Sequence, residues 1–225
     1  MAVKPSDLFL SSDLTEEQAQ AYLQSLGFRD PGAADRALQA MAEELPVRLA
    51  LGEVADALVD GLQRVADPNA AIAGLAAYLA TRMSKVTFLN HLRDDPHATD
   101  VLLQIFGASG PLGEMLLRDP DHFHWLMARI DRRPSGNLDD EELSRARAGQ
   151  CEPHTLERLC RRQLLRVGTR AMIGRETAET AAAQLSQLAD LIAAQAADPE
   201  LRAHLDAELA AVRAFATRRP DEVGT

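Results

Sequence analysis

Cysteine and aromatic residues are scarce in this sequence. Only two cysteines occur, Cys151 and Cys160, and they lie nine residues apart with no Cys-x-x-Cys pair. This spacing argues against a zinc ribbon or a disulfide framework and is typical of a reducing cytosol, so we expect a cytoplasmic protein. Aromatic residues make up 4% of the 225 residues, β-branched residues are also few, and Ala and Leu dominate. This composition favours helix over strand, because Ala and Leu lose little entropy in a helix.

Long apolar runs are absent as well. No stretch approaches the roughly 18 apolar residues that a membrane-spanning helix needs, and the N-terminus lacks the pattern of a secretory signal. The formal net charge is −10, which disfavours nucleic acid as a partner of the chain as a whole. Neither a glycine-rich phosphate-binding motif nor a GxSxG nucleophile motif occurs. The residues alone therefore predict no membrane association, no nucleic-acid binding and no catalytic site.

Helix signals, in contrast, occupy almost the whole chain. Thr15 and Gln18 form a capping box that opens a helix ended by Gly27, and Pro153 opens a long helix ended by Gly174. Asp-Pro pairs precede amphipathic runs, so that the aspartate can cap the helix and the proline can take its first position. No convincing strand signal occurs, and we predict an all-α fold, an irregular multi-helix bundle or array without a sheet. The Asp-Pro pairs lie at residues 30–31, 67–68, 95–96, 119–120 and 198–199.

Weak helix signals predict the domain organisation. Residues 46–66 fit one long helix or two short ones that meet at Gly52. Residues 131–153 combine a loop pattern, Arg-Arg-Pro-Ser-Gly-Asn, with an acidic helix start. We therefore predict an N-terminal helical subdomain at 1–130, a linker at 131–153 and a further helical segment at 154–225.

The stretch RDPDHFHWL, residues 118–126, resembles a metal site because Asp119 and Asp121 match the DxD pattern of nucleotidyltransferases. On a strand, a period of two points both carboxylates to one side, but no strand signal surrounds this pair. His122 and His124 are about 200° apart around a helix and cannot share a metal ion. We interpret the stretch as the start of a helix and predict no metal ligands in the chain. A metal site at the two aspartates remains a weaker hypothesis.

An arginine stripe consists of Arg158, Arg162, Arg166 and Arg170, which lie four residues apart and drift by about 120° around a predicted helix. Residues 151–175 hold six arginines against two glutamates, in a chain that is acidic overall. One interpretation is a solvated face that pairs with the acidic bulk. The other is a ligand or partner surface, for instance for nucleotide phosphates, which a guanidinium binds with two parallel hydrogen bonds. The opposite face is apolar and includes Cys160, which we expect to be buried, whereas Cys151 is expected to be exposed.

Several segments, in order, resemble the glutamine synthetase adenylyltransferase family, whose bifunctional enzymes attach AMP to glutamine synthetase and remove it. Residues 26–31, LGFRDP, resemble an early "LGF-D-P" motif of the family. Residues 103–126 resemble its "lGtS.fLadlLlrhPelldwL" segment. Residues 161–174 and 179–191 resemble "RRrellRIaarDllg" and "et..eLS.LAda". The resemblance covers about residues 22–195, although Ala171 and Met172 replace the acidic residue common in the third motif.

The family's catalytic motif, "GmGKlGgxElnxxSDlDLif", has no counterpart in the sequence. In the family it lies on a strand-turn-strand unit and carries the metal-binding aspartates, and this chain ends about where that unit is expected to begin. We therefore interpret the chain as the N-terminal helical part of such an enzyme, carry over no catalytic residue and expect the chain alone to be inactive.

The resemblance implies ATP and Mg²⁺ as cofactors of the full-length enzymes, with none in this chain. It implies glutamine synthetase as a partner and leaves a nitrogen-signalling regulator as a further one. The alternative hypothesis is a non-catalytic helical adaptor that binds a protein or an anionic ligand through the arginine stripe.

Overall fold

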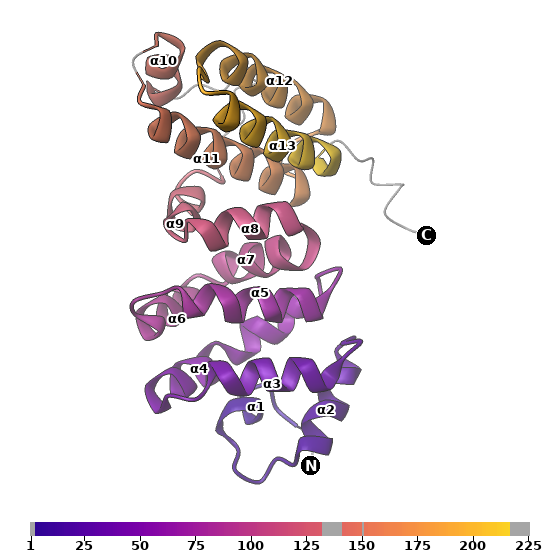
Figure 1. Cartoon of the computed structure of the whole chain (residues 1–225). Helices are drawn as coiled ribbons and strands as arrows, with labels where there is room; N and C mark the ends of the chain where they lie inside the picture. Colours follow the sequence, from indigo (N-terminus) through magenta and orange to yellow (C-terminus); the bar gives the residue numbers. More distant parts are fainter. Residues whose placement is uncertain (1–2, 132–140, 150, 217–225) are drawn as a thin grey trace. The chain divides into compact units, whose positions relative to one another are not determined.

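The structure, a computed structural model, describes residues 3–131, 141–149 and 151–216. Every regular element within these ranges is a helix, and no strand occurs among them, which confirms the predicted all-α fold (Figure 1). Contacts between Cα atoms divide the chain into two compact units, Met1–Pro120 and Asp121–Thr225. The division lies before the segment 131–153 that we predicted as a linker, and residues 132–140 and 150 of that segment are outside the described residues. Within the described part, none of the helices combines the length and apolar character needed to cross a bilayer.

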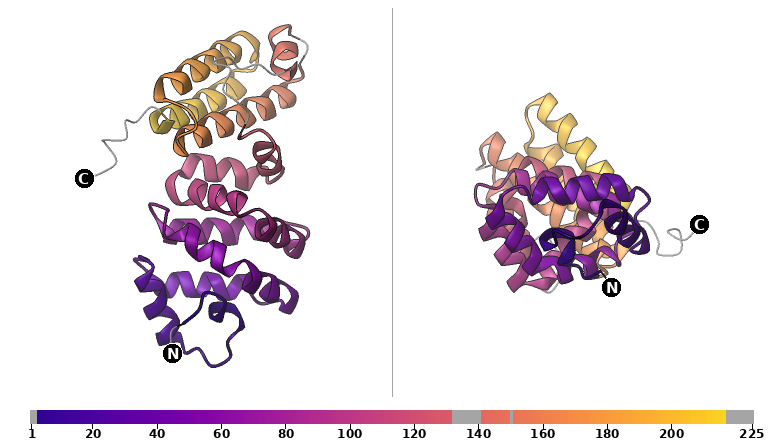
Figure 2. Two further views of the ribbon diagram at one scale, coloured as in Figure 1. Left: turned by 180° about the vertical axis from the view of Figure 1, so that it is seen from behind. Right: turned by 90° about the horizontal axis from the view of Figure 1, so that it is seen from below.

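The first unit is built from helices that pack in neighbouring pairs. α5 packs against both α3 and α7, and α4 packs against α6 and α7 (Figure 2). Leucine is the most frequent buried side chain, and the buried residues recur three or four positions apart, so each helix turns one apolar face to the core. The helices are α1 (Asp7–Leu10), α2 (Glu16–Ser25), α3 (Pro31–Met41), α4 (Leu45–Leu62), α5 (Pro68–Ala80), α6 (Lys85–Asp94), α7 (Pro96–Ala108) and α8 (Gly110–Arg118).

The helix starts of this unit follow the predicted caps. The side chains of Asp30, Asp67 and Asp95 each accept a hydrogen bond from the backbone N–H three residues later, at 2.8, 3.0 and 3.1 Å. The Thr15–Gln18 capping box is also present, with both reciprocal hydrogen bonds. These contacts satisfy N–H groups that have no partner inside the helix, so the chain can begin a helix at a defined residue. Helix α6, which begins after Ser84, was not among the predicted segments.

The LGFRDP segment ends one helix, anchors the chain and starts the next helix. Gly27 adopts a φ of 91°, and the N–H groups of Gly27 and Phe28 donate to the carbonyls of Gln24 and Leu23, a Schellman motif. Phe28 is buried. Asn69, at the start of α5, accepts from the N–H groups of Arg29 and Asp30 and donates back to the Asp30 carbonyl. The motif that carried part of the family resemblance is therefore a packed corner between α2, α3 and α5.

Two glycines of the first unit lie inside helices and not at their ends. Residues 46–66 contain one continuous helix, α4, so Gly52 is not a break. A Cβ at Gly52 would lie 2.6 Å from a methyl carbon of Leu10, which means that the glycine admits the α1 side chain. Gly107 likewise lies inside its helix, because α7 continues to Ala108.

The second unit contains α9 (Asp121–Met127), α10 (Glu141–Arg147), α11 (Pro153–Met172), α12 (Ala178–Gln195) and α13 (Pro199–Ala216). Helices α11, α12 and α13 lie side by side and pack against one another, and α9 packs on α11 (Figure 1). α11 ends as predicted at Gly174, which has a φ of 70°. The N–H groups of Gly174 and Arg175 donate to the carbonyls of Ala171 and Arg170, a second Schellman motif. Thr177 then caps α12 by accepting from the Thr180 N–H.

Candidate functional site

The predicted arginine stripe does not form one surface. Arg158 is exposed, Arg162 and Arg166 are half-buried, and Arg170 is buried with 2% of its surface exposed. The interpretation of the whole stripe as a solvated face is therefore wrong for Arg170. The stripe drifts around α11, and the drift carries its C-terminal half into the contact with α12. The N-terminal half (Arg158 and Arg162) and the C-terminal half (Arg166 and Arg170) therefore have different environments.

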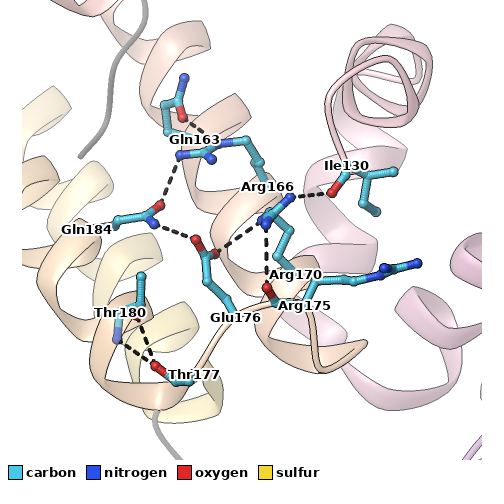
Figure 3. A network of polar contacts seen from close by, with 9 residues as sticks. All are labelled: Ile130, Gln163, Arg166, Arg170, Arg175, Glu176, Thr177, Thr180 and Gln184. Carbon is cyan, nitrogen blue, oxygen red and sulfur yellow. Dashed lines mark hydrogen bonds and ion pairs between the residues drawn. The ribbon is translucent and has the colours of Figure 1, made fainter. Parts of the chain in front are cut away.

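The C-terminal half belongs to a buried polar network (Figure 3). Arg170 forms an ion pair with Glu176 at 3.5 Å, and the side chain of Glu176 is fully buried. The guanidinium of Arg170 also donates to the backbone carbonyls of Ile130 and Arg175. It therefore ties the segment after α9 and the turn after α11 to one point in the core.

Glutamine side chains extend this network to Arg166. Gln184 donates from its amide nitrogen to Glu176 and accepts, at 3.0 Å, from Arg166. Arg166 donates a second hydrogen bond, at 2.9 Å, to the side chain of Gln163. Gln163 and Gln184 are both buried, so these polar groups satisfy one another away from solvent. Arg166 therefore joins α11 to α12, and Arg170 joins α11 to the turn after it and to the segment after α9.

The N-terminal half of the stripe has a different environment. The guanidinium carbon of Arg162 lies 5.6 Å from the ring centroid of Trp125, and that of Arg129 lies 4.7 Å from the same centroid. Trp125 is 8% exposed and comes from α9, which packs on α11. Within the described residues, Arg129, Arg158 and Arg162 form no ion pair with a carboxylate. Arg129 and Arg162 therefore meet at the ring of Trp125, a residue that the sequence analysis did not select.

Arg161, on the same helix α11, forms ion pairs. It pairs with Glu157 at 2.8 Å and with Glu208 of α13 at 3.1 Å, and it contacts His204 at 2.7 Å. These contacts join α11 to α13. The arginine lies outside the predicted stripe, and its carboxylate partner on α13 could not be identified from local spacing.

The RDPDHFHWL stretch is a helix start, with one correction. α9 begins at Asp121, so Pro120 precedes the helix and does not open it as we predicted. His122 is buried and His124 is exposed, in agreement with their predicted separation around the helix. In the described part of the chain, no group of three His, Cys, Asp or Glu side chains is arranged to hold a metal ion.

A pocket of about 420 Å³ lies in the first unit between α3 and α5. Alanines form much of its wall, and its polar groups include Asp30, Asp67 and Asn69. The two aspartates already cap helices, and Asn69 already bonds the backbone of residues 29 and 30. These polar groups hold the local fold together, so we assign no chemistry to this pocket.

Cys160 is fully buried, as expected, whereas Cys151 is only partly exposed. Burial raises the pKa of the Cys160 thiol to about 12, with smaller contributions from Cys151 and Glu208. At a given pH its thiolate fraction is then about a thousandfold lower than that of a thiol with the ordinary pKa of 9.0.

We expect a thiol reagent at mildly alkaline pH to label Cys151 in the native chain and both cysteines after unfolding. Rapid native labelling of a Cys151→Ser variant would contradict this burial.

The described residues define an all-helical protein in which several polar side chains cap helices and a few pair inside the core. No protein-family model matches the sequence, and no solved structure matches it. Curated relatives do match it. The bifunctional glutamine synthetase adenylyltransferase/adenylyl-removing enzyme of Leifsonia xyli is 27% identical over 197 residues, which cover 84% of this chain and 20% of that protein. The enzyme of the same name from Streptomyces avermitilis is 32% identical over 167 residues, which cover 72% of this chain and 16% of that protein.

A third relative with this name, from Xanthobacter autotrophicus, is 27% identical over 214 residues, covering 85% of this chain. The chain belongs to the glutamine synthetase adenylyltransferase family, as its ordered motifs indicated. It spans about a fifth of the length of these curated relatives.

Proposed function

We propose that this chain is a non-catalytic helical part of a protein that adenylylates or deadenylylates glutamine synthetase. The observation that carries the proposal is the match of most of the chain to about a fifth of each relative, all named for this reaction. In this role the helices are a scaffold and a surface for the protein partner. The cytoplasm is the compartment that we propose for it.

The proposal assigns no step of AMP transfer to the residues described. Adenylyl transfer from ATP commonly relies on Mg²⁺, which neutralises phosphate charge and activates the attacking oxygen. Carboxylates would have to hold such an ion, and the described residues contain no group of three suitable ligands. The aspartates that lead α3, α5 and α7 already accept backbone hydrogen bonds. ATP and Mg²⁺ are therefore proposed for the family's catalytic unit.

The test is an adenylylation assay with purified components. We expect the isolated chain to transfer no label from ATP to glutamine synthetase in the presence of Mg²⁺, while the Streptomyces avermitilis relative serves as the active control. Labelled glutamine synthetase produced by the pure chain would contradict the proposal.

A chimera tests the scaffold role: this chain replaces the matching segment of the Streptomyces avermitilis relative. We expect the chimera to retain activity that deletion of the segment abolishes; a folded but inactive chimera would count against the role.

The second candidate is a free-standing adaptor that binds a protein partner through the arginine stripe. It is favoured by one observation, that Arg158 and Arg162 form no ion pair within the described residues. Charge reversal of these two arginines should abolish partner binding and leave helicity unchanged. Arg166 and Arg170 are unsuitable for this test, because their replacement would disrupt the buried network.

A further inference from the structure

We propose that Trp125, Arg129 and Arg162 form a binding site for a phosphate group. The site is distinct from the proposed function, which concerns the matched scaffold and glutamine synthetase. It also differs from the predicted stripe, since it excludes Arg166 and Arg170 and includes two residues from α9 and the turn after it.

The three side chains of this cluster share one chemical property. The indole N–H and the two guanidinium groups offer hydrogen-bond donors and no acceptors. Both guanidinium carbons lie within 6 Å of the Trp125 ring centroid. Because Trp125 and Arg129 are four residues apart at the end of α9, and Arg162 comes from α11, only the packing of these two helices brings the three together.

Two buried donors of this cluster have no acceptor among the residues that the structure describes. The indole nitrogen of Trp125 and Nε of Arg162 are both shielded from solvent, and neither has a hydrogen-bond partner within the described residues. Trp125 as a whole is more than nine-tenths buried. Buried donors are normally satisfied, so such a pair requires an explanation, and a bound anion supplies one.

The charge of the cluster also favours an anionic ligand. The cluster holds two positive charges, and no carboxylate of the described residues pairs with Arg129 or Arg162, although the chain has a net charge of −10. A phosphate monoester carries close to two negative charges at neutral pH, which matches two arginines. A carboxylate carries one charge and two oxygens, so it would leave part of the cluster unmatched. The ligand class is therefore phosphate, either free or as a monoester.

Trp125 is the only tryptophan of the chain, so its fluorescence reports directly on the site. We expect inorganic phosphate, added at constant ionic strength, to change this emission saturably. Arg129→Gln and Arg162→Gln should each weaken binding by about tenfold, as expected for the loss of a charge-assisted hydrogen bond. Arg158→Gln is the matched control, since it removes the same charge one turn away on α11 and should change affinity by less than about twofold.

Titration calorimetry extends the test to Trp125 itself and to the source of the phosphate. Trp125→Phe keeps a ring in place but removes the N–H, and it should weaken phosphate binding severalfold. AMP binding more tightly than inorganic phosphate would identify a monoester as the ligand, and the reverse would identify free phosphate. No saturable signal in fluorescence or heat at millimolar phosphate would overturn the proposal. Equal losses in Arg158→Gln and Arg162→Gln would overturn it too, because they would show only a diffuse positive field.

Discussion

Replacing Glu176 by Gln should lower the free energy of unfolding of the second unit by about 3–5 kcal/mol, the usual effect of removing one partner from a buried ion pair. The substitution keeps the shape of the side chain but removes the carboxylate charge that Arg170 faces at 3.5 Å. Arg170 is 2% exposed, so water cannot replace the lost carboxylate. Its hydrogen bonds to the carbonyls of Ile130 and Arg175 carry no compensating charge.

Urea unfolding followed by the fluorescence of Trp125 measures this effect, because the single tryptophan lies in the second unit. Arg170→Met should also destabilise the unit, and the double variant Arg170→Met/Glu176→Leu should recover much of the loss, since it removes both buried charges. The surface pair of Arg175 and Asp131 provides the control. Both of its members are more than half exposed, so Arg175→Gln should change stability little. A Glu176→Gln variant as stable as the parent chain would show that the pair contributes nothing.

Replacing Gly74 by Ala should destabilise the first unit by about 1–2 kcal/mol, although helix propensity alone predicts a gain of about 1 kcal/mol. Gly74 lies inside α5, and a Cβ there would be 2.4 Å from the ring of Phe106. Phe106 belongs to α7 and also packs near Gly113 of α8. The ring therefore has little room to move away, and the added methyl must displace it or the helix.

The two tyrosines, Tyr22 and Tyr78, both lie in the first unit, so near-ultraviolet circular dichroism of tyrosine follows its unfolding. The ring centroid of Tyr78 is 5.9 Å from that of Phe106, which places this probe beside the change. Gly74→Ala/Phe106→Leu should recover stability by making room. Gly110→Ala is the control, because a Cβ there meets nothing within 4 Å and should be neutral or slightly stabilising. If both glycine variants proved equally stabilising, the close packing of α5 on α7 would be refuted.

Most helix boundaries could be predicted from the sequence because the contacts that set them are local. The caps at Asp30, Asp67, Asp95 and Thr15 each bond an N–H three residues away. One question stayed open where the answer depended on a more distant residue. The sequence allowed either one helix or a break at Gly52, and only the contact with Leu10 explains why a glycine occurs inside α4.

The candidate site could be predicted only in part. Spacing along α11 identified the arginines, yet Arg166 and Arg170 point to partners on other segments, such as Gln184 and the Ile130 carbonyl. Trp125 and Arg129 were not selected, because nothing in the local sequence relates them to Arg162. Their common feature, contact with one ring, arises when α9 packs on α11.

The sequence by itself determined most of the helices, most of their ends and the family, since caps, glycine stops and ordered motifs are properties of short segments. The tertiary structure alone decided which charges are buried. Four arginines at equal spacing have nearly the same intrinsic preferences, but the drift of the stripe around α11 exposes Arg158 and encloses Arg170. A buried charge needs a counter-charge that the packing of another segment must bring, and for Arg170 that segment is the turn holding Glu176.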